Sequence, residues 1–149
     1  MLFRSLNENA RLIVFATTNP SSNGGVFELN QDLKSRFAIW NWDYPTSEQE
    51  IELVNPAYIP PDFVNGLLRL ANETRLAEKK GTLDYGISTR DIADAFDIYR
   101  SYKGVTLINP AQFVLESKIL GNYDDEDQIN TVKSRIESIF GKSVLGSGE

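Results

Sequence analysis

The segment Arg11-Leu-Ile-Val-Phe-Ala-Thr-Thr-Asn-Pro20 decides the expected fold of this chain. Its apolar run, residues 12–16, predicts a strand buried on both faces, as in a parallel sheet covered by helices. Pro20 cannot donate to a sheet ladder and disfavours a helical Asn19, so the strand should end there. Asn19 would then lie at the carboxyl edge of the sheet, where open α/β sheets bind ligands. The alternative is a core strand capped by an ordinary Asn-Pro turn.

The composition excludes several classes of chemistry. The 149 residues include no cysteine and no histidine, which removes disulfides, thiolate nucleophiles, histidine bases and the usual zinc ligands. The net charge is −6 and the basic residues are scattered, so binding to nucleic acid is not expected. No apolar run approaches the roughly 20 residues of a membrane-spanning helix. The N-terminal segment also lacks a secretory signal pattern. We therefore expect a cytoplasmic chain with no metal site of its own and no membrane partner.

The first part of the chain is predicted to be an α/β fragment. A second strand is expected over residues 37–44, where apolar and polar side chains alternate before Pro45. Asn30 is a plausible N-cap for a short helix over residues 31–35. Thr46 and Ser47 can cap a further helix that continues to about residue 54, and Ser47 with Glu50 fits a capping box.

From Pro60 onward the pattern is helical. Apolar residues recur at helical spacing in four stretches, each bounded by proline, a capping residue or glycine. The expected helices cover approximately residues 61–80, 89–103, 110–120 and 125–140. The predicted fold is thus an α/β fragment followed by an all-α bundle of about four helices. We expect the α/β part over residues 1–58, the helical part over 59–141 and a frayed glycine- and serine-rich tail over 142–149.

Two arginines are candidates for phosphate recognition. Arg36 follows the first short helix, and a permanently charged, forked donor there suits a phosphate on a neighbouring molecule. Its alternative role is a surface ion pair. Arg90 lies in the first turn of a predicted helix, where a positive charge opposes the helix macrodipole. A bound anion would compensate this charge, and so would Asp91 or Asp94.

In their order, these features resemble an ATPase of the AAA+ superfamily, and residues 11–54 look most like its MoxR and CbbQ/NorQ branch. The resemblance rests on Val-Phe-Ala-Thr-Thr-Asn-Pro, Gly-Val-Phe-Glu-Leu-Asn-Gln-Asp-Leu-Lys-Ser-Arg-Phe, Asp-Tyr-Pro-Thr-Ser-Glu-Gln-Glu-Ile-Glu and Gly-Ile-Ser-Thr-Arg-Asp. It implies that Asn19 is sensor 1, which positions the attacking water. It likewise implies that Arg36 is the arginine finger acting on nucleotide of the adjacent subunit. Arg90 would be sensor 2, on the helical lid.

The chain departs from that family in one large respect. It contains no G-x-x-x-x-G-K-[ST] phosphate loop and no acidic pair at the end of an apolar strand before Arg11. We therefore expect the C-terminal portion of an AAA+ module, inactive alone, without tight binding of ATP or Mg²⁺. In the full-length protein the resemblance implies ATP and Mg²⁺ as cofactors, a ring of identical subunits and a protein target that is remodelled or activated, a chaperone-like role. The rival hypothesis is a standalone helical protein-interaction module without a nucleotide role.

Overall fold

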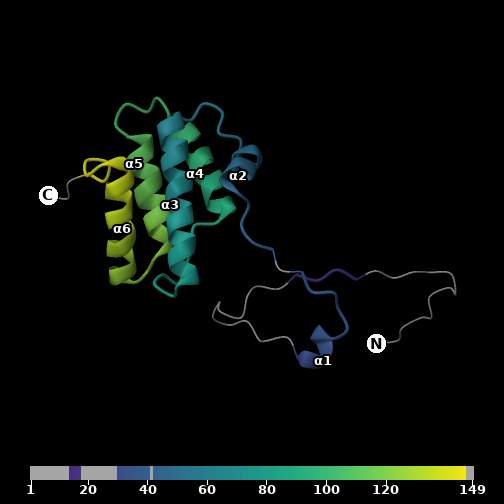
Figure 1. Ribbon diagram of the computed structural model, residues 1–149. Helices are drawn as coiled ribbons and strands as arrows, with labels where there is room; N and C mark the ends of the chain where they lie inside the picture. The colour runs from purple at the N-terminus through teal and green to yellow at the C-terminus, as the bar shows by residue number, and fades with distance from the viewer. Residues whose placement is uncertain (1–13, 18–29, 41, 147–149) are drawn as a thin grey trace, which may run out of the picture. The chain divides into compact units, whose positions relative to one another are not determined.

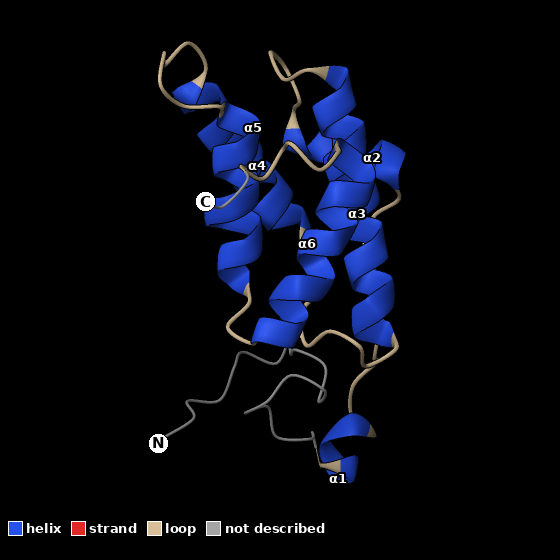
Figure 2. Ribbon diagram, turned by 90° about the vertical axis from the view of Figure 1, so that its left-hand side faces the viewer, coloured by secondary structure: helices blue, strands red, loops and turns tan. Residues whose placement is uncertain are grey.

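The computed structural model describes residues 14–17, 30–40 and 42–146. The chain divides into two units, residues 1–40 and residues 41–149, and Figure 1 shows the elements of each. Secondary structure in the described residues is entirely helical (Figure 2). The only helix of the first unit in these residues is α1, Gln31–Lys34, a single turn. Asn30 is its predicted cap, since the side-chain oxygen accepts from the Asp32 N–H at 3.1 Å.

The two predicted strands are not formed in the described residues. Residues 14–16 of the first, and residues 37–40 and 42–44 of the second, have no regular secondary structure. The predicted α/β fragment is therefore not found there. A strand is stable only when its N–H and C=O groups pair with a neighbouring strand, and the described residues contain no such ladder. Apolar alternation indicates a strand only where that neighbour exists.

The second unit is a helical bundle, as predicted for the region from Pro60 onward. In Figure 1, consecutive long helices run in opposite directions, and α2 lies beside α4. One π turn, Leu115–Ile119, and one 3-10 turn, Leu120–Asn122, continue α5. The α-helices of this unit are α2 (Ser47–Val54), α3 (Pro61–Lys79), α4 (Thr89–Tyr102), α5 (Pro110–Val114) and α6 (Glu126–Phe140).

Local sequence explains where these helices begin. Pro61 occupies the first position of α3, where its missing N–H costs least. Ser88 caps α4, and Asn109 caps α5 by accepting from two backbone N–H groups. The cap of α2 differs from the prediction: the capping box joins Thr46 to Gln49, not Ser47 to Glu50. The Glu50 side chain is instead completely buried in the bundle.

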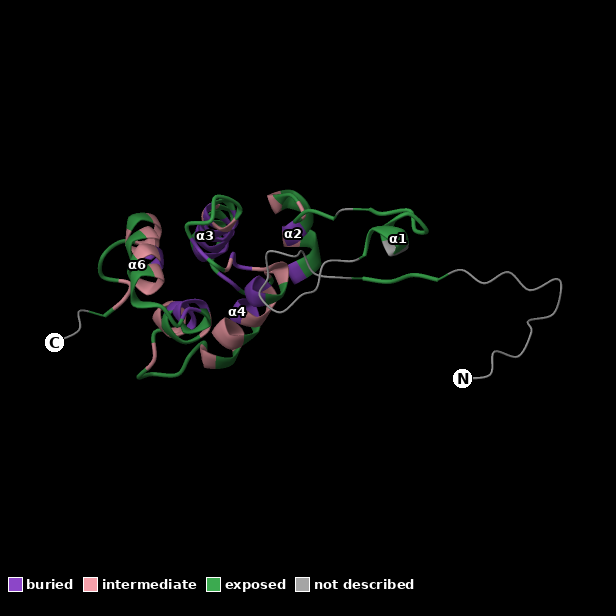
Figure 3. Ribbon diagram, turned by 90° about the horizontal axis from the view of Figure 1, so that it is seen from below, coloured by how far each residue is buried: buried purple, intermediate pink, exposed green. Residues whose placement is uncertain are grey.

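The core of the second unit is formed by one apolar face from each helix (Figure 3). Phe96 and Leu67 are among its largest fully buried side chains. Phe140 packs closely over Gly66 of α3, so closely that a Cβ at Gly66 would stand 2.3 Å from the ring. All buried apolar side chains of the described residues lie between Val54 and Ile136. The second unit therefore has a core of its own.

Candidate functional site

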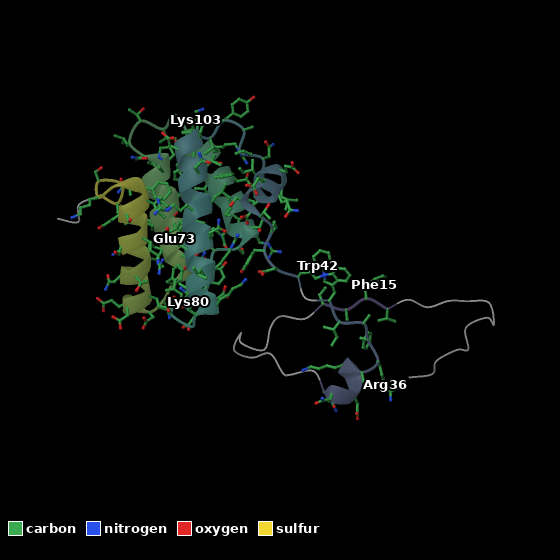
Figure 4. All side chains as sticks on the ribbon, in the orientation of Figure 1. Phe15, Arg36, Trp42, Glu73, Lys80 and Lys103 are labelled. Carbon is green, nitrogen blue, oxygen red and sulfur yellow. The ribbon has the colours of Figure 1, made fainter. Side chains whose placement is uncertain are left out.

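The three residues predicted from the resemblance have different outcomes. Asn19 lies outside the described residues. Arg36 follows α1 in the first unit, is exposed and makes no hydrogen bond or ion pair with another described residue (Figure 4). Arg90 is the second residue of α4 in the second unit and is also exposed. Their roles stay predictions, although both arginines have the exposure that contact with another molecule requires.

The acidic residues near Arg90 could compensate its positive charge in the first turn of α4. The two acids that could have compensated it, Asp91 and Asp94, do not pair with Arg90. Both instead form ion pairs with Lys118, at 3.1 Å and 2.9 Å respectively. Arg90 therefore presents its cation at the start of α4 without an ion pair to another described residue.

A buried cluster, which we call the Arg75 cluster, holds the start of α4. Its centre is an ion pair between Arg75 and Glu50, whose side chains are 5% and 0% exposed. The two guanidinium N–H groups donate to the two carboxylate oxygens at 3.0 and 2.5 Å. Thr89 donates its hydroxyl to Glu50 at 2.6 Å, and Arg75 Nε donates to the Ile87 carbonyl at 2.7 Å. Thr74 closes the cluster by accepting from the Ile87 N–H at 3.1 Å.

The segment that precedes α2 also contacts this cluster. The Arg75 guanidinium lies 4.0 Å from the ring centroid of Tyr44, a cation–π contact. One residue earlier, Asp43 accepts from Lys79 Nζ at 3.0 and 2.9 Å. This ion pair is exposed, so it stabilises little, whereas Tyr44, itself 38% exposed, covers a buried cation.

A second polar cluster, the Asp91 cluster, forms the capping box of α4. Asp91 accepts from Ser88 N at 2.9 Å and from Ser88 Oγ at 2.5 Å, and it also accepts from the Tyr85 hydroxyl. Lys118 and Asn122 reach the other carboxylate oxygen from the turns that follow α5. The two clusters together fix the loop over residues 85–89 from both sides.

Titration of the Asp91 cluster reflects these contacts. Burial raises the pKa of Asp91, but hydrogen bonds from Ser88, Tyr85 and Lys118 outweigh burial and lower that pKa to about 2. The pKa of Lys118 is raised, chiefly by its hydrogen bond to Asp94. Burial raises the pKa of the Tyr85 hydroxyl, and its bond to Asp91 acts in the same direction. The Asp91 carboxylate and the Lys118 ammonium are therefore both charged throughout the physiological pH range.

Gly86 lets this loop approach α3. A Cβ at that position would lie 2.8 Å from the Arg75 Cα and 2.6 Å from a Glu78 carboxylate oxygen. The Cα atom belongs to the helix backbone and cannot rotate away. A glycine is therefore required for the loop to lie where Arg75 Nε reaches the carbonyl of the next residue, Ile87.

Sequence reasoning missed the residues that hold this site. The sequence pattern places Glu50 in a capping box and indicates no role for Arg75. One signal was available: Arg75 lies four residues after Ala71, on the apolar face of α3, so the helical period places it inside the bundle. A charge at such a position requires a partner, but the partner cannot be identified without the tertiary structure.

Further observations limit the chemistry of the described residues. They contain no group of three or more acidic side chains that could hold a metal ion. No helix among them combines the length and the apolar character needed to span a membrane. Comparison of the chain with protein-family models, curated proteins and solved structures found no match.

Proposed function

We propose that this chain is the sensor and lid portion of an AAA+ ATPase similar to the MoxR and CbbQ/NorQ branch. In the full-length protein it would couple ATP binding and hydrolysis to the remodelling or activation of a protein partner. The ordered series of motifs from residue 11 to residue 91 carries this proposal. The finer assignment of residues 1–58 to an α/β core is part of the same proposal.

Arg90 provides the structural support. In a sensor 2 role its guanidinium must reach nucleotide phosphates outside the helical unit. An exposed arginine in the first turn of α4, with its neighbouring acids paired to Lys118, meets that requirement. The helix N-terminus contributes backbone N–H groups and a favourable dipole for the same anion.

Arg36 provides weaker support of the same kind. An arginine finger acts on nucleotide held by a neighbouring subunit, so it must be exposed and available in its own chain. Arg36 is exposed and has no partner among the described residues. Asn19 would orient the attacking water as sensor 1. Together these three residues supply part of an ATPase site, since a phosphate loop and magnesium ligands are needed as well and the chain has no phosphate-loop motif.

The test compares arginine variants in the assembled full-length ATPase. Arg36→Ala should lower ATP hydrolysis by roughly 10³-fold or more while nucleotide binding changes little, the scale expected of an arginine finger. Lys34→Ala, which removes a nearby cation, is the matched control and should retain activity. Arg90→Ala should weaken the response to nucleotide, whereas Arg69→Ala, on an exposed face of α3, should not. Full activity in both Arg36→Ala and Arg90→Ala would contradict the proposal.

A complementary test uses the 149-residue chain alone. Because it lacks a phosphate loop, the purified chain should show no ATP turnover and no tight binding of ATP with Mg²⁺. ATP turnover by this chain that disappears in Asn19→Ala would show that hydrolysis does not need a phosphate loop, and the expectation of an inactive chain would be wrong.

The rival function, a helical protein-interaction module, is favoured by one observation. A groove of about 490 Å³ between α2 and α3 is lined by Ile51, Leu68 and Leu76 together with six polar or charged residues. Leu76 remains 53% exposed there. If Leu76→Asp abolishes binding of a protein partner while both arginine variants retain every measured activity, the interaction module is the better explanation.

A further inference from the structure

We propose that Arg75 is a positioning residue that couples the connecting segment, residues 42–46, to the first turn of α4. This segment joins the first unit to the helices of the second, and the turn carries Arg90. The Arg75 side chain, deep in the bundle, contacts the segment directly and is linked to the turn through Ile87 and through Glu50.

On one side, Arg75 holds the connecting segment. Its guanidinium lies under the Tyr44 ring, 4.0 Å from the centroid. The segment then enters α2, where Glu50 takes both terminal N–H groups of the same guanidinium. Tyr44 and Glu50 thus flank one planar cation, and a shift of the segment must either break one of these contacts or move the guanidinium.

On the other side, the same cluster determines where α4 begins. Arg75 Nε donates to the Ile87 carbonyl, the residue immediately before the cap of α4. Glu50 in turn accepts the hydroxyl hydrogen bond of Thr89, the first helical residue. Arg90 is the next residue along the chain. The contacts of Arg75 and of its partner Glu50 therefore extend from Tyr44 to Thr89, the residue beside Arg90.

The planar geometry of the arginine side chain keeps these contacts in a fixed arrangement. The guanidinium is planar, and its Nε and both terminal nitrogens are all engaged here, so its orientation cannot change for one partner alone. Because the ion pair between Arg75 and Glu50 is buried, neither charge can exchange its partner for water without a large change in solvation free energy. A lysine would preserve the charge but not the planar arrangement of three donor nitrogens.

The functional consequence rests on the proposed function. If Arg90 contacts nucleotide, then the position of the connecting segment and the reach of Arg90 toward the phosphates depend on each other. The coupling itself requires no nucleotide, because it is a property of three contacts: Tyr44 with Arg75, Arg75 with Glu50, and Glu50 with Thr89. Its experimental test can therefore fail or succeed independently of the ATPase assignment.

The forward test perturbs Tyr44 and observes α4 by amide hydrogen exchange in the full 149-residue chain. Tyr44→Leu should accelerate exchange at the Ile87 and Asp91 N–H groups by roughly tenfold, equivalent to about 1.4 kcal/mol. These amides are hydrogen-bonded to Thr74 Oγ1 and Ser88 Oγ. Reference amides in the interior of α6 should not change. Tyr44→Phe retains the ring and should behave as the unmodified chain.

The matched control is Tyr58→Leu. Tyr58 also places its ring beside a cation, Lys103 at 5.9 Å, but it has no contact with the Arg75 cluster. This variant should leave exchange at Ile87 and Asp91 unchanged. Equal acceleration by both tyrosine variants, or acceleration of the α6 amides together with those of α4, would mean general destabilisation and would overturn the coupling.

The reverse test perturbs α4 and observes the connecting segment. The chain has two tryptophans, so Trp40→Phe leaves Trp42 as the only tryptophan reporter, beside Asp43. In that background, Thr89→Val should lower Trp42 fluorescence anisotropy, and Arg75→Lys should do the same. Thr131→Val, at a half-buried position of α6, is the control. Since coupling between two sites is reciprocal, an unchanged anisotropy in Thr89→Val and Arg75→Lys would overturn the proposal.

Discussion

The two units differ in whether their apolar side chains are buried or exposed to solvent. In the first unit the side chains whose exposure is described are all exposed, and Phe15 is 90% and Ile39 61% accessible. In the second unit Phe96 and Ile136 are completely buried. Residues of the same chemical type therefore end in opposite environments within one chain. An apolar residue is buried only where several elements present apolar faces to each other, a condition that the described part of the first unit does not meet.

The second unit also buries charged side chains, and each of them has hydrogen-bond or ion-pair partners. Glu50 and Arg75 satisfy each other and two further groups, and Asp91 accepts from several donors. The second unit is thus stabilised by an apolar core together with specific polar clusters.

Glu50→Ala should have the largest effect. It leaves the Arg75 cation buried without its carboxylate, and breaking such a pair costs about 3–5 kcal/mol of unfolding free energy. Urea denaturation of the full chain measures this loss. Glu48→Ala, an exposed change in the same helix, should stay within about 0.5 kcal/mol of the unmodified chain. A similar loss in both variants would show that the buried pair is not what distinguishes the second unit.

Asp91→Asn should change the pH dependence of stability. Because the folded pKa is lowered to about 2, the ionised Asp91 stabilises the unit above the unfolded pKa, near 4. This stabilisation, about 2 kcal/mol, is lost as pH falls from about 4 to 2. Asp91→Asn should therefore lower stability at neutral pH and flatten the acid slope. Asp94→Asn, at a more exposed site, should retain most of that slope.

Gly86→Ala should destabilise the second unit by about 1–3 kcal/mol, because the new methyl group collides with the α3 backbone at Arg75. Thermal unfolding measures the effect. Gly121→Ala is the control, since a Cβ there meets only a carbonyl oxygen at 4.0 Å. An unchanged melting temperature for Gly86→Ala would indicate that the loop can move away from α3 without loss.

Removal of residues 1–40 should have the smallest effect. The remaining chain keeps every buried apolar side chain of the described residues together with Glu50. Its unfolding midpoint should match that of the 149-residue chain within a few degrees. A chain that starts at Pro60 loses Glu50 and should be clearly less stable, although its four long apolar stripes are intact. A large loss on removing residues 1–40 alone would break the contrast between the units.

Local sequence predicted the helical part of this protein well. The helices predicted to begin near residues 61, 89 and 110 do begin there, as α3, α4 and α5. These signals act within one helical turn, so no distant contact is needed to interpret them. The predicted strands are not found in the described residues. A strand depends on a partner strand, elsewhere in the chain or in another chain, which local sequence does not identify.

The sequence by itself also determined the chemical limits of the protein, since a chain without cysteine or histidine cannot use either side chain. Only the tertiary structure decided which charges are buried and which are available. Glu50 and Arg75 are 25 residues apart, and Asp91 meets Lys118 across the bundle. Such pairs depend on how helices pack, which side-chain periodicity does not specify. For that reason Arg90 could be predicted as a candidate, but the clusters that hold its helix could not.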